Sequence, residues 1–193
     1  MFKIGGEIMS STVVSKEVIL EHSRNLIQQQ GWEAINIRTL AAACDVSVGT
    51  IYNYFASKAE LVTATIESIW FDIFHVSKQP QEFESFISCI EWIHSCVQQG
   101  IKKYPNFFHG HSMSFVDKEK AAGKQVMQQS WNHIKQAMYF TLQKDANVWQ
   151  DAFNDTFTAQ KFIDVVFELL LVQIQKENND NSIILEIIKR SIY

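Results

Sequence analysis

Residues 46–61, VSVGTIYNYFASKAEL, place two tyrosines two positions apart in a stretch that also holds a glycine and a lysine. At 3.6 residues per turn, side chains two positions apart point about 200° apart around a helix. Ile51 and Phe55, which are four positions apart, are predicted to form the buried face, with Tyr52 beside it and partly buried. Tyr54 is then predicted to face outward, and the question is which partner it contacts there.

Capping residues divide the neighbouring sequence into short helices. Ser15, Asn36 and Ser57 can each accept hydrogen bonds from the free amides of a helix start, and Gly31 can end the first helix. The predicted helices cover residues 15–31, 37 to 43 or 44, 48–55 and 58–76.

Two short helices joined by a tight turn form a helix-turn-helix, whose second helix would enter the DNA major groove. The predicted turn covers residues 45–47. Thr50 lies four positions before Tyr54 and shares its exposed face, so both hydroxyls could reach phosphate oxygens. On this interpretation, DNA is the partner of the exposed tyrosine.

The rest of the chain is also predicted to be helical. Apolar residues recur at steps of three and four along almost all of its 193 residues, and strand signals are nearly absent. We expect further helices over residues 81–104, 119–143, 148–175 and 182–193, with Thr158 as a candidate cap that would divide the third. The predicted fold class is all-α.

Bulk properties restrict the class of protein. No apolar run reaches the roughly 18 residues of a membrane span, and the first residues do not resemble a signal peptide. The three cysteines, Cys44, Cys89 and Cys96, indicate reduced thiols in a cytoplasm rather than a disulfide framework. Residues 1–60 hold five basic and six acidic residues, which disfavours a non-specific nucleic-acid binder and predicts a shallow salt dependence.

Enzymatic and metal sites are not indicated. The sequence has neither a nucleophile-elbow motif nor a glycine-rich phosphate loop, so we expect no catalysis and no cofactor. His109 and His111 flank Gly110, with His94 and Cys96 nearby in sequence, but their spacing does not match a zinc site. We therefore expect no metal.

The segment from residue 15 to about residue 62 resembles the DNA-binding domain of the TetR family of one-component transcriptional regulators. The matching positions are Gly31-Trp32, Leu40-Ala41, Ser47, Gly49, Thr50, Tyr52, Tyr54, Phe55, Lys58 and Leu61. The resemblance implies a three-helix DNA-binding domain followed by a larger helical domain for effector binding and dimerisation. The expected boundaries are a flexible arm at 1–13, a DNA-binding domain at 14–62 and an effector and dimerisation domain at 63–193.

The resemblance also implies roles for single residues at a DNA interface. Asn53 would pair with adenine, Val48 would touch a thymine methyl group, and Arg38 would reach guanine or a phosphate. Lys58, with the amide end of the following helix, would bind phosphate. The full expected DNA-binding set is Arg38, Ser47, Val48, Gly49, Thr50, Tyr52, Asn53, Tyr54 and Lys58.

Asp45 departs from the glycine that the family usually has in this turn. If the position requires a positive φ, Asp tolerates it better than most side chains but less well than Gly.

The helical domain carries no motif, and its expected roles follow mainly from the resemblance. Aromatic and methionine side chains are expected to line an apolar effector cavity, namely Trp92, Met113, Phe115, Met127, Trp131 and Met138. The last two helices are strongly apolar and are expected to pair with those of a second copy, through Phe162, Val166, Leu169, Leu170, Ile184, Ile187 and Ile188. An ordinary core within one chain is the alternative for each of these residues.

Together these features predict a dimeric transcriptional regulator, a repressor that binds a palindromic operator and is released by a small apolar or amphipathic effector. One alternative is an activator, or a regulator that a protein partner controls. A second is an enzyme or carrier that uses the helix-turn-helix only as a scaffold.

Overall fold

The computed structural model describes residues 14–31, 34–74, 82–104, 107, 120–176 and 179–193, without the side chains of 120–127, 130 and 175. The helices are α1 (Lys16–Gln30), α2 (Ile37–Ala43), α3 (Val48–Tyr54), α4 (Lys58–Ile73), α5 (Phe86–Lys103), α6 (Lys120–Lys144), α7 (Ala159–Gln175) and α8 (Ser182–Ile192). No strand occurs in these described ranges, and the predicted all-α class is confirmed. None of the described helices is both long and apolar enough to span a membrane.

Side-chain caps fix where most of these helices begin. Ser15, Asn36, Ser57 and Thr158 each accept a hydrogen bond from a backbone amide of the following helix, as their sequence positions predict. Gly31 ends α1 with a φ of 80°, a left-handed conformation that glycine adopts without a steric penalty.

Two predicted helices differ from the structure. The helix expected from residue 81 starts only at Phe86, after the cap Ser85. Residues 148–158 form turns, and the predicted internal cap Thr158 is in fact the start of α7. Both differences come from polar side chains that bond to the backbone and compete with the helix: Asn154, for example, accepts hydrogen bonds from the amides of Thr156 and Phe157.

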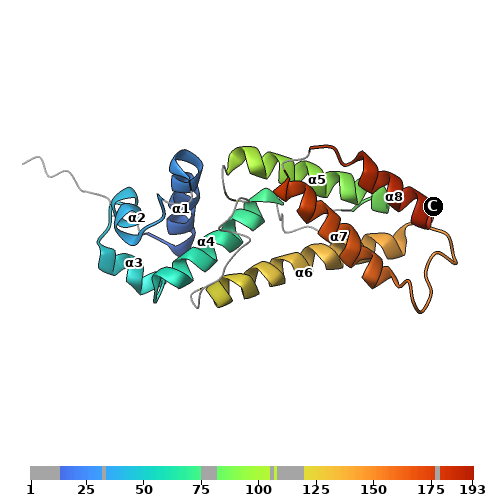
Figure 1. The fold of residues 1–193 in the computed structure, drawn as a ribbon. Helices are drawn as coiled ribbons and strands as arrows, with labels where there is room; N and C mark the ends of the chain where they lie inside the picture. The colour runs from blue at the N-terminus through green and yellow to red at the C-terminus, as the bar shows by residue number, and fades with distance from the viewer. Residues whose placement is uncertain (1–13, 32–33, 75–81, 105–106, 108–119, 177–178) are drawn as a thin grey trace, which may run out of the picture.

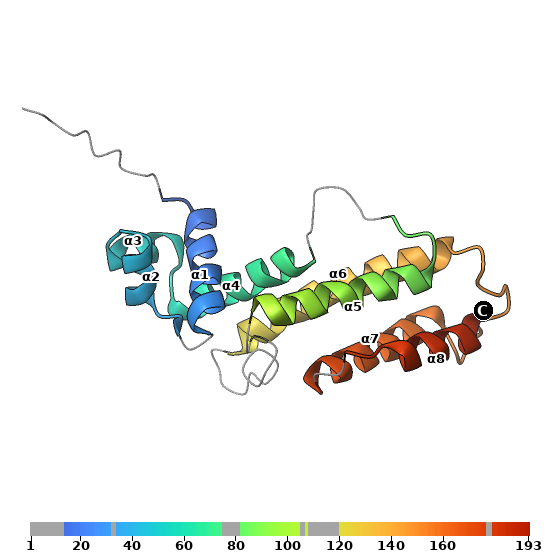
Figure 2. The ribbon, with the colours of Figure 1, turned by 90° about the horizontal axis from the view of Figure 1, so that it is seen from above.

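The helices form two groups that α4 joins (Figure 1). α1, α2 and α3 lie together at one end, and α5 to α8 form a longer bundle at the other. Figure 2 shows α7 and α8 side by side along one flank of that bundle. The core follows the same division: Leu61 packs with α1–α3, whereas Ile66, Ile69 and Trp70 of α4 pack with the bundle.

The C-terminal end of α4 is fastened to α5. A Cβ atom at Gly100 would lie 2.8 Å from the Ile73 side chain, so glycine is what lets these two helices approach. Asp72 accepts hydrogen bonds of 2.7 Å from both Lys103 and Tyr104. Burial alone would raise the pKa of Asp72, but these two donors outweigh it and hold the pKa below its usual value. A displacement of α4 therefore has to involve α5.

Candidate functional site

The turn between α2 and α3 is closed by a backbone hydrogen bond and contains one left-handed residue. The amide of Val46 donates to the carbonyl of Ala41 over 2.9 Å. Asp45 has a φ of 54°, so the position does require the conformation that favours glycine. The condition considered from the sequence is therefore met, and Asp45 stands in a left-handed position that Asp tolerates less well than Gly.

One face of α3 is buried and the other is open. Ile51 is fully buried and Phe55 is 1% exposed, in the core that α1 and α2 share. Val48, Gly49 and Asn53 are exposed. Side chains can reach base edges only from a helix face that no other element covers, so this is the arrangement that a recognition helix needs.

The exposure of the two tyrosines agrees only in part with the prediction. Tyr54 is 36% exposed, but its hydroxyl donates to the carbonyl of Val14, just before α1. Tyr52, expected to be partly buried, is 48% exposed and is the more accessible of the two. The prediction for Tyr52 was therefore wrong, and helical periodicity alone could not show that the carbonyl of Val14 lies within reach of Tyr54.

Ser47 and Thr50 support the start of α3. The Ser47 hydroxyl accepts a 3.1 Å hydrogen bond from the amide of Thr50, and the two hydroxyl groups lie 2.9 Å apart within hydrogen-bonding distance. These groups therefore already have partners within the chain. Each hydroxyl retains capacity for at least one more contact.

Gly49 occupies open space on the exposed face. The nearest atom to an added Cβ would be Oγ of Ser47, at an ordinary 3.6 Å. Nothing within the described chain therefore requires glycine at this position. A glycine that folding does not need marks a place where another backbone or a ligand can approach closely.

The two basic side chains of the expected set, Arg38 and Lys58, are both exposed. The amide end of α4 is partly occupied, because Ser57 caps the amide of Glu60 at 3.1 Å. The Glu60 carboxylate accepts a 2.8 Å hydrogen bond from the amide of Ala56, at the same end. A carboxylate at this helix end would compete with a phosphate, so the expected phosphate contact would depend mainly on the exposed Lys58 side chain.

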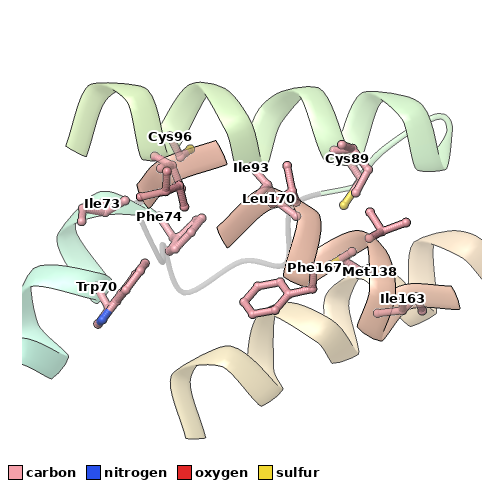
Figure 3. Packing of buried hydrophobic residues seen from close by; sticks show 14 of the residues in the cluster. Trp70, Ile73, Phe74, Cys89, Ile93, Cys96, Met138, Ile163, Phe167 and Leu170 are labelled. Atoms are coloured by element: carbon pink, nitrogen blue, oxygen red, sulfur yellow. The ribbon is translucent and has the colours of Figure 1, made fainter. Parts of the chain in front are cut away.

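A small cavity lies inside the second group of helices. Its volume is about 20 Å³, which is close to the space that one water molecule occupies. Trp70 and Phe74 line it from α4 and its end, Ile93 and His94 from α5, and Phe167 from α7. Figure 3 shows Phe74, Ile93 and Leu170 directed toward one another in this region.

Three of the predicted effector residues, Trp92, Trp131 and Met138, have described side chains, and none of these three lines the cavity. Trp92 packs against Phe74, with ring centroids 5.9 Å apart, and Trp131 packs edge-on against Phe167 at 5.8 Å. Met138 is fully buried in the core. The remaining three, Met113, Phe115 and the Met127 side chain, lie outside the described residues. Trp70 and Phe74 were missed, although their spacing of four marks one helix face.

The predicted dimerisation residues divide into two groups. Five are buried inside a single chain and belong to its core: Phe162, Val166, Leu170, Ile184 and Ile188. Leu169 is half-buried and Ile187 is exposed. The apolar side chains that α7 and α8 leave exposed are Val165, Val172, Ile183 and Ile187, so the candidate interface is shifted around each helix relative to the expectation.

The described part of the chain contains neither a metal-binding site nor a reactive thiol site. No group of three His, Cys, Asp or Glu residues there is placed to hold a metal ion. His109 and His111 lie outside the described residues. Cys89 and Cys96 are buried, and burial raises the pKa of each thiol to about 11, which keeps both thiols protonated and unreactive.

Comparison with known proteins agrees with this interface. A family model described as bacterial regulatory proteins, tetR family, matches residues 19–65. The HTH-type transcriptional repressor KstR of Rhodococcus jostii (strain RHA1) is 26% identical over 110 residues, which are 57% of this chain. KstR of Mycolicibacterium smegmatis is 38% identical over 48 residues, 25% of this chain. The matches span 51% and 24% of these relatives, about half of their length or less.

Solved structures share the fold over most of the chain. The unliganded structure of RolR superposes with a TM-score of 0.61 at 15% identity and covers 89% of this chain and 87% of RolR. A putative TetR family regulator from Vibrio parahaemolyticus gives a TM-score of 0.55 at 15% identity, over 92% of this chain and 97% of that one. RolR in complex with resorcinol gives 0.57 at 16%, over 90% and 85%. The helix-turn-helix segment thus matches the tetR family of bacterial regulatory proteins over residues 19–65, and the chain as a whole shares the fold of these solved structures.

Proposed function

We propose that this chain is a cytoplasmic, dimeric one-component transcriptional repressor that binds a palindromic operator through α3. The observation that carries this proposal is the uncovered face of α3, where Val48, Gly49 and Asn53 are exposed on a helix whose opposite side is locked into a core. The KstR relatives are named as transcriptional repressors, which favours repression over activation. The same relatives also favour a regulator over an enzyme that uses the helix-turn-helix only as a scaffold.

A second copy is the proposed partner of α7 and α8. One recognition helix reads only a few base pairs, so helix-turn-helix proteins gain affinity by pairing across a twofold axis. Val165 is 55% exposed on α7 and Ile183 is 66% exposed on α8, which is a poor arrangement for a lone chain in water. Ile183→Glu should convert a dimer into a monomer in analytical ultracentrifugation, whereas Lys189→Glu, also on an exposed position of α8, should not.

A small molecule is the proposed signal, and α4 is its route to DNA. Trp70 and Phe74 line the cavity and belong to the helix that begins beside α3. The fold accommodates small aromatic ligands, since RolR was solved with resorcinol. An effector that needs more than about 20 Å³ must displace these rings, and so favours a second position of α4. The small volume also supports the alternative that a protein partner supplies the signal.

The test is operator selection with the purified protein, a random duplex library and sequencing of the retained DNA. We expect a palindromic site. Asn53→Ala and Tyr52→Ala should each weaken binding to it, by roughly tenfold or more if a base contact is lost. Asn25→Ala, an exposed amide on α1, is the matched control and should bind as the unaltered protein does.

Tyr54→Ala is not a suitable probe of DNA contact, because it would also remove the hydrogen bond to Val14. Failure to enrich any sequence, with protein that is folded and dimeric, would contradict sequence-specific binding by the free protein.

A further inference from the structure

The cavity behind α4 has one side chain whose chemistry differs from that of all its other lining residues. The walls that the described helices provide are aliphatic or carry large aromatic rings, apart from His94 on α5. An ion that entered this space would lose its hydration without finding a counter-charge in the lining, which is strongly unfavourable. The walls therefore select for a neutral and largely apolar molecule.

His94 has an unused hydrogen-bonding atom in this setting. Its Nε2 atom is shielded from solvent and has no hydrogen-bond partner among the described residues. Buried polar atoms are normally paired, and an unpaired one that persists calls for a specific explanation. A ligand group that pairs with Nε2 would remove this deficit.

The protonation state of His94 determines whether this ligand group has to donate or accept the hydrogen bond. Burial lowers the pKa of His94, and the nearby carboxylate of Asp180 opposes this effect only in part. The imidazole is therefore neutral near pH 7, with one nitrogen that donates and one that accepts. A neighbouring carboxylate favours the tautomer that keeps the proton on the nitrogen nearer to it. Because Nε2 is the nitrogen that is buried without a hydrogen-bond partner, we assign the acceptor role to Nε2 and the proton to Nδ1.

Asp180, the charged group that acts on His94, is held by hydrogen bonds to two helices. Its carboxylate accepts a 2.9 Å hydrogen bond from the amide of Ser182, at the start of α8. Its backbone carbonyl accepts a 2.6 Å hydrogen bond from the side chain of Gln173 on α7. His94, Gln173 and Ser182 thus come from three helices, and Asp180 links the last two. These bonds keep the carboxylate of Asp180 near His94, where the two groups interact electrostatically.

We propose that His94 sets the specificity of the effector site, by accepting a hydrogen bond at Nε2 from the hydroxyl group of a neutral, mainly apolar ligand. This inference rests on the proposed function, in which a small effector occupies this cavity. His94 would orient the ligand, while Phe74 and Phe167 supply apolar contact.

The test compares two probes that differ mainly in a hydroxyl group, 4-fluorophenol and 4-fluorotoluene, with the full chain and without DNA. Titrations followed by ¹⁹F NMR give the two dissociation constants. We expect the phenol to bind about tenfold more tightly, the ratio that one net hydrogen bond of about 1.4 kcal/mol produces.

His94→Phe should abolish this preference and leave the affinity for 4-fluorotoluene within about twofold, since a ring of similar shape remains but the acceptor is lost. His94→Gln, which keeps an acceptor, should retain part of the preference. His133→Phe, an exposed histidine on α6, is the matched control and should change neither affinity. A preference that survives in folded His94→Phe would overturn the proposal, as would the absence of any preference in the unaltered protein.

A second measurement needs no variant. The ¹⁵N resonance of His94 Nε2 should shift when 4-fluorophenol is added and stay in place with 4-fluorotoluene. If neither probe binds up to its solubility limit, this cavity is not the effector site and the proposal fails. Operator binding by the same preparation distinguishes a failure of this proposal from a failure of the proposed function. If the protein binds the operator but binds neither probe, it is a DNA-binding regulator whose effector site is not this cavity.

Discussion

At the scale of single residues, a substitution of Gly49 should weaken DNA binding without impairing folding. A Cβ there would meet only Oγ of Ser47 at 3.6 Å, so Gly49→Ala should fold normally. Its free energy of unfolding should rise by up to about 1 kcal/mol, because glycine within a helix is less favourable than alanine. Operator affinity should fall, since the new methyl group stands on the face proposed to approach DNA.

Urea denaturation and operator titration measure the two effects. Gly31→Ala is the matched control: its φ of 80° strains any L residue, so that variant should lose stability. If Gly49→Ala binds the operator like the unaltered protein, the backbone of α3 does not approach DNA at this position.

Asp45 allows a direct test of strain in the turn. Its φ of 54° lies in the left-handed region, which costs an L residue roughly 1–2 kcal/mol, less for Asp and nothing for Gly. Asp45→Gly should therefore raise the free energy of unfolding by about 0.5–1 kcal/mol, and Asp45→Ala should lower it. Urea denaturation of the three proteins checks this order; an Ala variant as stable as the Asp protein would show that the turn is not strained.

This turn also shows what the sequence could predict about the site. The spacing of Ile51 and Phe55 gave the buried face of α3 correctly, because helical periodicity is a local property. The partner of Tyr54 is Val14, forty positions away, and no local pattern contains that information. The same limit applies to the cavity, whose lining comes from α4, α5, α6 and α7.

At the scale of elements, local caps were predictable and tertiary caps were not. Ser15, Asn36 and Ser57 each bond to an amide three residues ahead, a contact that the sequence alone can identify. The start of α5 has both kinds of cap, because Ser85 accepts a 3.1 Å hydrogen bond from the amide of Ser88 and a distant residue adds a second. Asp145, which follows α6, accepts a 2.7 Å hydrogen bond from the amide of Phe86, 59 positions earlier. The predicted start at residue 81 was early by several residues; the local cap Ser85 could have been identified from the sequence, but the contact with Asp145 could not.

Asp145 should make the stability of this junction depend on pH. It is 7% exposed and also accepts hydrogen bonds from the Tyr193 hydroxyl and from the amide of Asn147, the latter at 3.0 Å. Burial alone would raise the pKa of Asp145, but these donors lower it below the usual value. A carboxyl group whose pKa is lower in the folded state stabilises the fold above its unfolded pKa of about 3.9. That contribution is lost as the pH falls through the folded pKa.

We therefore expect the free energy of unfolding to fall more steeply between pH 6 and pH 3 in the unaltered protein than in Asp145→Asn, which cannot titrate. Urea denaturation at a series of pH values measures the difference. Tyr193→Phe should cost about 1–2 kcal/mol at pH 7, because it removes a hydrogen bond to a charged group. Equal pH profiles for the unaltered protein and Asp145→Asn would contradict the assigned role of the carboxylate.

At the scale of the whole molecule, the charge of the chain limits how it can hold DNA. Its net charge is −4, and the exposed basic side chains of the expected DNA-binding set are Arg38 and Lys58. A dimer would present each of them twice, about four phosphate or base-edge contacts in all. Each neutralised phosphate contributes about 0.9 to the slope of log K against log salt concentration, so we expect a slope near −4, shallow for a repressor.

Lys58→Gln tests the charge argument and the twofold assembly in one experiment. In a dimer it removes two phosphate contacts, so the slope should become less steep by about 1.8; in a monomer the change would be about 0.9. Operator titrations between 50 and 300 mM salt resolve the two values, and Lys176→Gln, exposed at the end of α7 and far along the chain from α3, should leave the slope unchanged. A slope steeper than about −8 would contradict the expectation that hydroxyl and amide groups do much of the positioning. Basic residues beyond the expected set would then have to contact the phosphates.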